Sequence, residues 1–239
     1  MENPIDVGMN RTGLDLSPLS KRRMISYAVT EAGRAPESEG AFEAVHIAYT
    51  EEAERLGSVP LPATLRGMAS TAASRIAGKK PEVLIDKLGE RLAFERAGTR
   101  LYEAMLLKCG AVDASAVDVT ALARIRDDEE SHFHLVRKFL ERLGVDPTAM
   151  TPCADMAGVQ GMGLMQVVSD PRTTVAQALN ALLTAELTDN ASWDLLVELA
   201  DQAGQEEMAT EFNAALETER QHLQMVRGWL RDAVLREAA

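Results

Sequence analysis

Residues 122–143 read LARIRDDEESHFHLVRKFLERL, and this stretch decides the fold. Its apolar residues recur at alternating steps of three and four, which is the period of one face of an α-helix. Glu129 and His132 occupy that same face, at positions where core residues are expected. Because residues three apart lie on one side of a helix, the carboxylate and the imidazole point into the same interior space.

Three further segments repeat this arrangement. Near the C-terminus, Glu219 and His222 lie on an apolar helix face with the same Glu-x-x-His spacing. Two other apolar segments each carry a single glutamate, Glu95 and Glu186, at the corresponding core position. Each site begins about 10 to 13 residues from its expected helix start, which is about 15 to 20 Å along the axis at the usual rise. We therefore expect all these side chains to form one layer in the middle of a helical bundle.

The chemistry of this layer predicts a pair of metal ions. Four carboxylates can neutralise and bridge two cations, and imidazole is a good ligand for iron, zinc and copper. The mixture favours iron or manganese over calcium or magnesium. Buried carboxylates without a cationic partner would be very unfavourable. We therefore predict two iron ions per chain, with manganese or zinc as substitutes.

The expected architecture is all-α, with a four-helix bundle over residues 81–239. Its helices are predicted over residues 82–108, 117–143, 171–200 and 206–236. The short link after Gly110 makes the first two helices antiparallel. Residues 144–172 form a connection of 29 residues that can run the length of the bundle, which would make the second and third helices parallel. Asp170 and Pro171 are expected to be the N-cap and the first residue of the third helix.

Residues 1–80 do not share the bundle repeat and are predicted to be an N-terminal extension. An arm rich in Gly, Asn and Pro runs through Pro18, and helices are expected near residues 19–32 and 37–56. The division of the chain is therefore expected at the turn that precedes Pro81.

With these residues the chain resembles the ferritin-like superfamily, and in size and motif its rubrerythrin and bacterioferritin branch. The resemblance covers residues 82–236. It implies a ferritin-like bundle in which the lone glutamates and the histidines each bind one ion, while the glutamates of the two Glu-x-x-His pairs bridge both ions. The implied terminal ligands are Glu95, Glu186, His132 and His222, and the implied bridges are Glu129 and Glu219.

Two more residues gain a role from the resemblance. Ferritins and rubrerythrins place a tyrosine seven residues after the first lone glutamate, and Tyr102 occupies that position here. We expect it to contact the ligands, the alternative being a core tyrosine whose hydroxyl is satisfied elsewhere. Asp189 lies three residues after Glu186 on the same face. It is expected to hydrogen-bond a ligand histidine, or to be a seventh ligand like the extra carboxylate of rubrerythrins.

The other two histidines are not predicted to bind metal. Glu43 and His46 repeat the Glu-x-x-His spacing, but they lie about 100° off the apolar stripe of their helix. His134 points away from the apolar face that carries His132. These residues are interpreted as ordinary exposed helix flanks.

Composition restricts the class of protein. The formal net charge of −12 argues against nucleic acid and anionic membranes as partners. No apolar run has the length of a membrane span and the N-terminus has no signal-peptide pattern, so we expect a soluble, cytoplasmic protein. Cys109 and Cys153 are isolated and form no C-x-x-C pair, which excludes a rubredoxin-type iron site. A homo-oligomer, dimeric or larger, is expected.

The predicted function is that of a di-iron oxidoreductase of the ferroxidase or peroxidase type. Two ferrous ions about 3.5 to 4 Å apart permit a two-electron reduction of O2 or H2O2. An electron donor of unknown identity would complete the reaction. The first alternative is a subunit of an iron-storage cage, and the second is a metal-free or zinc-filled helical bundle that acts as a binding module.

Overall fold

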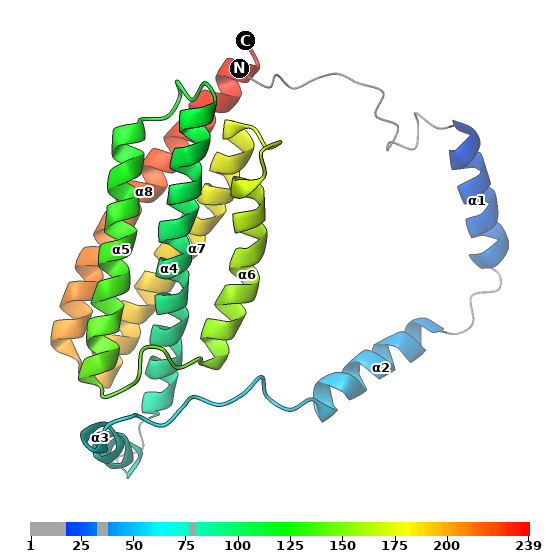
Figure 1. The fold of residues 1–239 in the computed structure, drawn as a ribbon. Helices are drawn as coiled ribbons and strands as arrows, with labels where there is room; N and C mark the ends of the chain where they lie inside the picture. The colour runs from blue at the N-terminus through cyan, green and yellow to red at the C-terminus, as the bar shows by residue number, and fades with distance from the viewer. Residues whose placement is uncertain (1–17, 33–37, 77–79) are drawn as a thin grey trace. The chain divides into compact units, whose positions relative to one another are not determined.

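The computed structural model describes residues 18–32, 38–76 and 80–239, and this part of the chain is helical and contains no strand (Figure 1). Its helices are α1 (Pro18–Ala32), α2 (Ser38–Glu52), α3 (Leu65–Ile76), α4 (Pro81–Ala111), α5 (Val119–Arg142), α6 (Pro152–Ser169), α7 (Val175–Ala203) and α8 (Glu206–Glu237). The contacts divide the chain into two units: α1 and α2 belong to one, and residues 57–239 form the other. None of the described helices is both long and apolar enough to cross a membrane.

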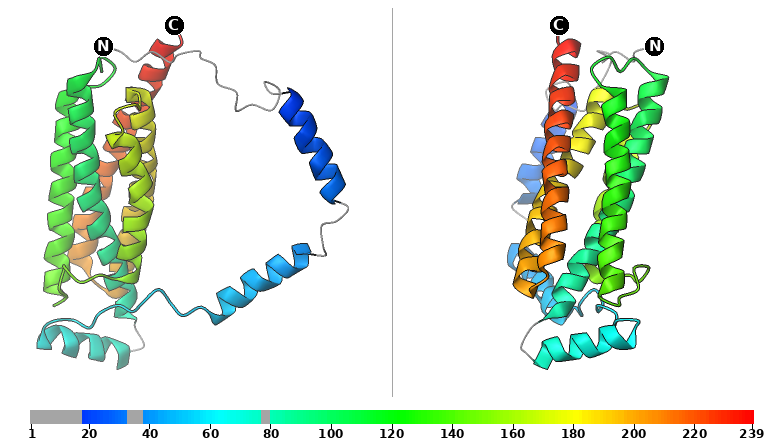
Figure 2. Two further views of the ribbon diagram at one scale, coloured as in Figure 1. Left: turned by 45° about the vertical axis from the view of Figure 1, so that its right-hand side comes forward. Right: turned by 90° about the vertical axis from the view of Figure 1, so that its left-hand side faces the viewer.

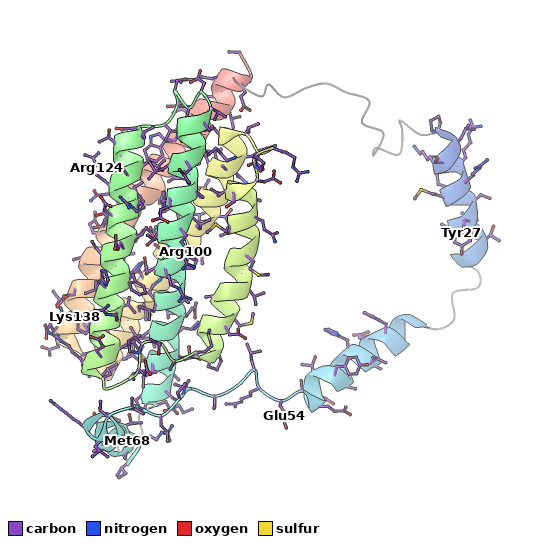
Figure 3. All side chains as sticks on the ribbon, viewed as in Figure 1. Tyr27, Glu54, Met68, Arg100, Arg124 and Lys138 are labelled. Atoms are coloured by element: carbon purple, nitrogen blue, oxygen red, sulfur yellow. The ribbon has the colours of Figure 1, made fainter. Side chains whose placement is uncertain are left out.

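The helices α4, α5, α7 and α8 form the predicted four-helix bundle. Helix α4 packs against α5 and α7, and α8 packs against α7 and α5. The chain ascends in α4, descends in α5, returns through α6, and then forms the α7 and α8 hairpin, so that α5 and α7 are parallel (Figures 1 and 2). This is the predicted connectivity. Arg100 and Arg124 are exposed on the bundle surface, whereas Lys138 of α5 forms an ion pair with Glu211 of α8; Figure 3 labels all three basic residues.

Helix ends follow local capping chemistry. Pro81 begins α4. A backbone N–H at the first position of a helix has no acceptor within the helix, so a proline there costs no hydrogen bond. The side chain of Asp118 caps α5 by accepting hydrogen bonds from the N–H groups of Thr120 and Ala121. Gly144, at φ +77°, turns the chain immediately after α5 in a conformation that favours glycine.

The long connection after α5 contains a helix that we did not predict. Helix α6 packs along α4 and is capped by Thr151, whose hydroxyl accepts a hydrogen bond from the N–H of Ala154. Its sequence has several glycines and methionines and a single charged residue, so it lacks the alternation of apolar and polar faces on which the prediction depended.

The predicted start of the third helix was wrong. Asp170 ends α6, and its carboxylate accepts hydrogen bonds from the backbone and side chain of Arg172. Helix α7 instead begins after Thr174, which forms a reciprocal capping box with Gln177. Both Asp and Thr are good N-caps, but only Thr174 is followed three residues later by a side chain that closes the box.

Helix α3 was also not predicted, and it belongs to the same compact unit as the bundle. The N–H groups of Ala63 and Thr64 donate to the carbonyl of Gly144 at 2.8 and 3.2 Å, and α3 packs against α4. The compact unit therefore begins at Gly57, whereas the prediction placed the division near residue 80. The N-terminal helices lie close to their predicted bounds, and the predicted arm falls outside the described residues apart from Pro18.

Two apolar clusters lie along the bundle axis. One includes Leu88, Phe139 and Phe212, and the other includes Met105, Leu122 and Leu179. On α4 the first cluster ends at Leu92 and the second begins at Leu101. The polar layer lies between them.

Candidate metal centre

The six predicted ligands meet in this layer, and all are buried. Relative exposures are Glu95 0%, Glu129 2%, His132 7%, Glu186 1%, Glu219 0% and His222 1%. They come from four different helices, so the layer exists only when the bundle is assembled. The regular helix period explains this convergence, because each residue occupies an apolar position of its own helix.

The ligand atoms form overlapping groups, each within 4.8 Å. One group contains Glu129, Glu186, Glu219 and His222, and a second contains Glu95, His132 and Glu219. A third joins Glu95, Glu129, Asp189 and Glu219. Glu219 belongs to all of them, which is the position required of a bridging carboxylate.

Each carboxylate oxygen of Glu219 faces a different histidine. Its Oε1 lies 2.5 Å from Nδ1 of His132, and its Oε2 lies 3.0 Å from Nδ1 of His222. Nδ1 of His222 is also 3.9 Å from Oε1 of Glu129. Both imidazoles therefore turn the same ring nitrogen toward the shared carboxylates.

The second ring nitrogen of His222 has its own partner, Asp128, which sequence reasoning missed. Nε2 of His222 lies 3.1 Å from Oδ2 of Asp128, whose side chain is 45% exposed. With the proton on Nε2, His222 donates to this carboxylate and leaves the lone pair of Nδ1 for a metal ion. Asp128 directly precedes Glu129, but its partner is 94 residues away, and only the packing of α5 on α8 pairs them.

Tyr102 is in contact with the layer, as predicted. It is 1% exposed, and its hydroxyl donates a hydrogen bond to Oε1 of Glu186. The other oxygen of Glu186 has no hydrogen-bond donor among the described residues. Tyr102 thus orients one oxygen of Glu186 and leaves the other for a cation.

Gly98 makes room for Glu129. A Cβ atom at Gly98 would collide with the carboxylate of Glu129, so this side chain lies directly against the backbone of α4. The sequence contains no spacing rule that identifies such a glycine, because the contact joins two helices.

Asp189 has a different partner from the one predicted. It is 1% exposed and pairs with Nη1 of Arg91, rather than with a ligand histidine. Its carboxylate still lies within the group that contains Glu95, Glu129 and Glu219, so coordination by Asp189 stays a prediction.

Arg91 is a further residue of the layer that the sequence pattern did not indicate. It is 1% exposed, and its Nε lies 2.9 Å from Oε1 of Glu95. Its guanidinium also lies 4.2 Å from the ring centre of Phe94 and 5.8 Å from that of Trp193. An arginine four residues before a glutamate is common on exposed helices, so its sequence position alone did not indicate burial.

Burial sets the protonation of the layer. It raises the pKa of Glu95, Glu129 and Glu219 well above their usual range, with neighbouring carboxylates adding to the effect. Burial, followed by the charge of Asp189, raises the pKa of Glu186 to about 8. Burial lowers the pKa of His132 to about 4 and also lowers the pKa of His222, so both imidazoles are neutral.

The other candidate residues lie away from this layer. His46 is exposed and stacks on Phe42 with ring centres 6.4 Å apart, and Glu43 is exposed beside it. His134 is exposed, and its Nε2 lies 3.9 Å from Glu130. These positions agree with the interpretation as helix flanks.

A family comparison covers the bundle. Residues 79–239 match the family model described as "Domain of unknown function (DUF892)". The chain belongs to the DUF892 family. This family lies within the ferritin-like superfamily, which confirms the resemblance at that level, while the rubrerythrin and bacterioferritin branch stays a prediction. No curated protein and no solved structure matches the DUF892 chain.

The donor set of this DUF892 protein is suited to bind metal. Five buried carboxylates face one buried arginine and two neutral imidazoles, which leaves four negative charges when every acid is ionised. Two divalent ions would carry an equal and opposite charge. Oε2 of Glu95 and Oε2 of Glu186 are buried without a hydrogen-bond donor in the described part of the chain. Cations would satisfy both the charge and these oxygens.

Proposed function

We propose that this DUF892 protein is a di-iron oxidoreductase of the ferroxidase or peroxidase type. The observation that carries the proposal is the buried layer in which Glu219 faces a neutral histidine on each side, surrounded by acids whose charge matches two divalent ions. Carboxylate and imidazole ligands together suit iron. Iron bound as a pair would supply two electrons to O2 or H2O2.

The residues of the chain support this role in distinct ways. Glu129 and Glu219 would bridge the ions, and the two histidines would bind through Nδ1, the nitrogen that faces Glu219 in each ring. The apolar clusters on either side of the layer exclude bulk water, which strengthens every electrostatic interaction inside it. Tyr102 holds Glu186 and places a phenol at the edge of the site.

The direct test is anaerobic loading with ferrous ions, followed by exposure to O2 or H2O2 and recording of absorbance. We expect about two ferrous ions per chain, oxidised in one rapid phase. The matched control is Glu130→Gln, which removes an exposed acid next to Glu129 and should leave loading and oxidation unchanged. Loading without accelerated oxidation would contradict the oxidoreductase proposal.

Two other measurements separate the alternatives. Light scattering gives the size of the particle: a large cage would favour iron storage, and a dimer or small oligomer would favour the enzyme. Metal analysis of freshly purified protein distinguishes iron from zinc and from an empty bundle.

Replacement of Tyr102 by Phe should keep both metal ions and change the rate of ferrous oxidation. No ligand is lost, but Oε1 of Glu186 loses its hydrogen-bond donor. Loss of one buried hydrogen bond also costs about 1 kcal/mol of stability. Stopped-flow oxidation of the loaded variant measures the effect. Wild-type kinetics with a lower melting temperature would assign Tyr102 a structural role only.

Replacement of Asp128 by Asn should weaken binding of one metal ion about 10- to 100-fold, as is typical when the partner of a ligand histidine is removed. The remaining ion should bind as in the wild type, because His132 does not contact Asp128 in this structure. Equilibrium metal titration provides the measurement, and Asp127→Asn, at an exposed neighbouring position, is the matched control. Equal effects of the two substitutions would argue against a specific role for Asp128.

A further inference from the structure

The metal layer has two halves, one around His132 and one around His222, and Arg91 makes them different. Arg91 contacts Glu95 through Nε and Asp189 through Nη1. Glu95 shares a group of candidate ligands with His132, Asp189 shares one with Glu95, and neither acid belongs to the group that contains His222. The side chain of Arg91 is 1% exposed and is flanked by the rings of Phe94 and Trp193. The guanidinium is therefore held in place and shielded from water, where its charge is effective over several ångströms.

The half that contains His222 has the opposite surroundings. Its group includes three glutamates, Glu129, Glu186 and Glu219, whereas the His132 group includes two, Glu95 and Glu219. The carboxylate of Asp128 lies against Nε2 of His222, while the rings of Trp193 and His132 meet in a T-shaped arrangement with their centres 5.5 Å apart. More negative charge thus surrounds the His222 position than the His132 position.

We propose that Arg91 is a positioning residue that withholds Asp189 and Oε1 of Glu95 from the metal ions, and thereby makes the His132 position the weaker of the two. This inference rests on the proposed two-metal site. Arg91 neutralises Asp189 and occupies one oxygen of Glu95, so the ion beside His132 has fewer available donors. The His222 position therefore fills first, and the His132 position fills second and exchanges more readily.

The experiment is a Mn²⁺ titration of the full chain, followed by calorimetry and by electron paramagnetic resonance. In the wild type we expect two steps at least about tenfold apart in affinity, since one fixed charge at close range is worth that much or more. After one equivalent the spectrum should be that of an isolated ion, and after two equivalents that of a coupled pair. His222→Ala should remove the first step, and His132→Ala the second.

Substitutions of Arg91 and of Asp189 should change the affinity of the second step in opposite directions. Arg91→Gln releases Asp189 and Glu95, so the second step should tighten at least about tenfold. Asp189→Asn leaves Arg91 unopposed, so the second step should weaken or disappear. The double variant keeps the net charge of the wild type and should restore the second step to within about threefold of it. Arg96→Gln removes an exposed charge from the same helix and should change neither step.

A purely structural arginine would give a different pattern. If Arg91→Gln weakens both steps, or if Asp189→Asn leaves the second step unchanged, the proposal is overturned. Should Arg91→Gln fail to fold, Asp189→Asn and the double variant still decide between these outcomes. Two equal steps in the wild type would refute the asymmetry and leave the two-metal site standing, whereas no binding of Mn²⁺ or Fe²⁺ at all would refute the site itself.

Discussion

Replacement of Glu219 by Gln should abolish binding of both metal ions. Each oxygen of Glu219 faces a different histidine, and its carboxylate takes part in every group of candidate ligands within the described residues. The amide that replaces it offers one neutral oxygen in place of two charged ones, so neither position keeps its bridge. We expect the metal content to fall from about two ions per chain to nearly none. Analysis of metal after anaerobic loading and desalting checks this result.

The matched control is Glu217→Gln, an identical change at an exposed position of the same helix. It should keep both ions. His132→Ala and His222→Ala should each lose one ion, because each imidazole faces one oxygen of Glu219. Retention of two ions by Glu219→Gln would show that Glu219 is not the bridge and would remove the main support for a two-metal site.

The metal-free protein should become more stable as the pH falls from 8 to 6.5. Burial raises the pKa values of all four glutamates of the layer, that of Glu186 to about 8. The folded protein therefore binds more protons than the unfolded chain above pH 4.5, and this stabilisation is lost as the pH rises through the folded pKa values. Each proton taken up changes the free energy of unfolding by about 1.4 kcal/mol per pH unit.

The histidines limit the pH range of this effect. The pKa of His132 is lowered to about 4 from a reference value of 6.5, and that of His222 is lowered as well, so both destabilise the folded protein below about pH 6.5. Thermal melts of chelator-treated protein between pH 8 and 6.5 therefore measure the contribution of the glutamates without that of the histidines. The metal-loaded protein should lack this increase, because ions replace the protons. A melting temperature of the metal-free protein that decreases over this range would count against a cluster of uncompensated acids.

The parts of the fold that the sequence predicted are those that local periodicity encodes. The four bundle helices and the burial of Glu95, Glu129, Glu186 and Glu219 follow from apolar steps of three and four within one helix. Helix α6 was not predicted because its sequence is apolar on most sides and contains several glycines, so it shows no apolar stripe with a helical period. The start of α7 was misplaced because the sequence offers two good N-cap residues, Asp170 and Thr174, and the helix begins after the second.

The missed residues of the site depend on contacts between helices. Arg91 and Asp189 are 98 residues apart, and Asp128 and His222 are 94 residues apart. Which residue at the border of an apolar stripe turns inward depends on the exact rotation of each helix in the bundle, and the stripe fixes that rotation only approximately. Gly98 is a further example, since its role is defined by the side chain of Glu129 on the neighbouring helix.

The separation of the core into two apolar clusters has a consequence for how the protein matures. Each cluster joins side chains from several helices without using any of the metal ligands, so the bundle possesses hydrophobic contacts on both sides of the polar layer before an ion arrives. Small metal-dependent domains differ in this respect, because without the ion they have too little core to fold. We therefore expect this chain to fold before a metal ion binds, so that occupation of the site would depend on the supply of metal rather than on folding.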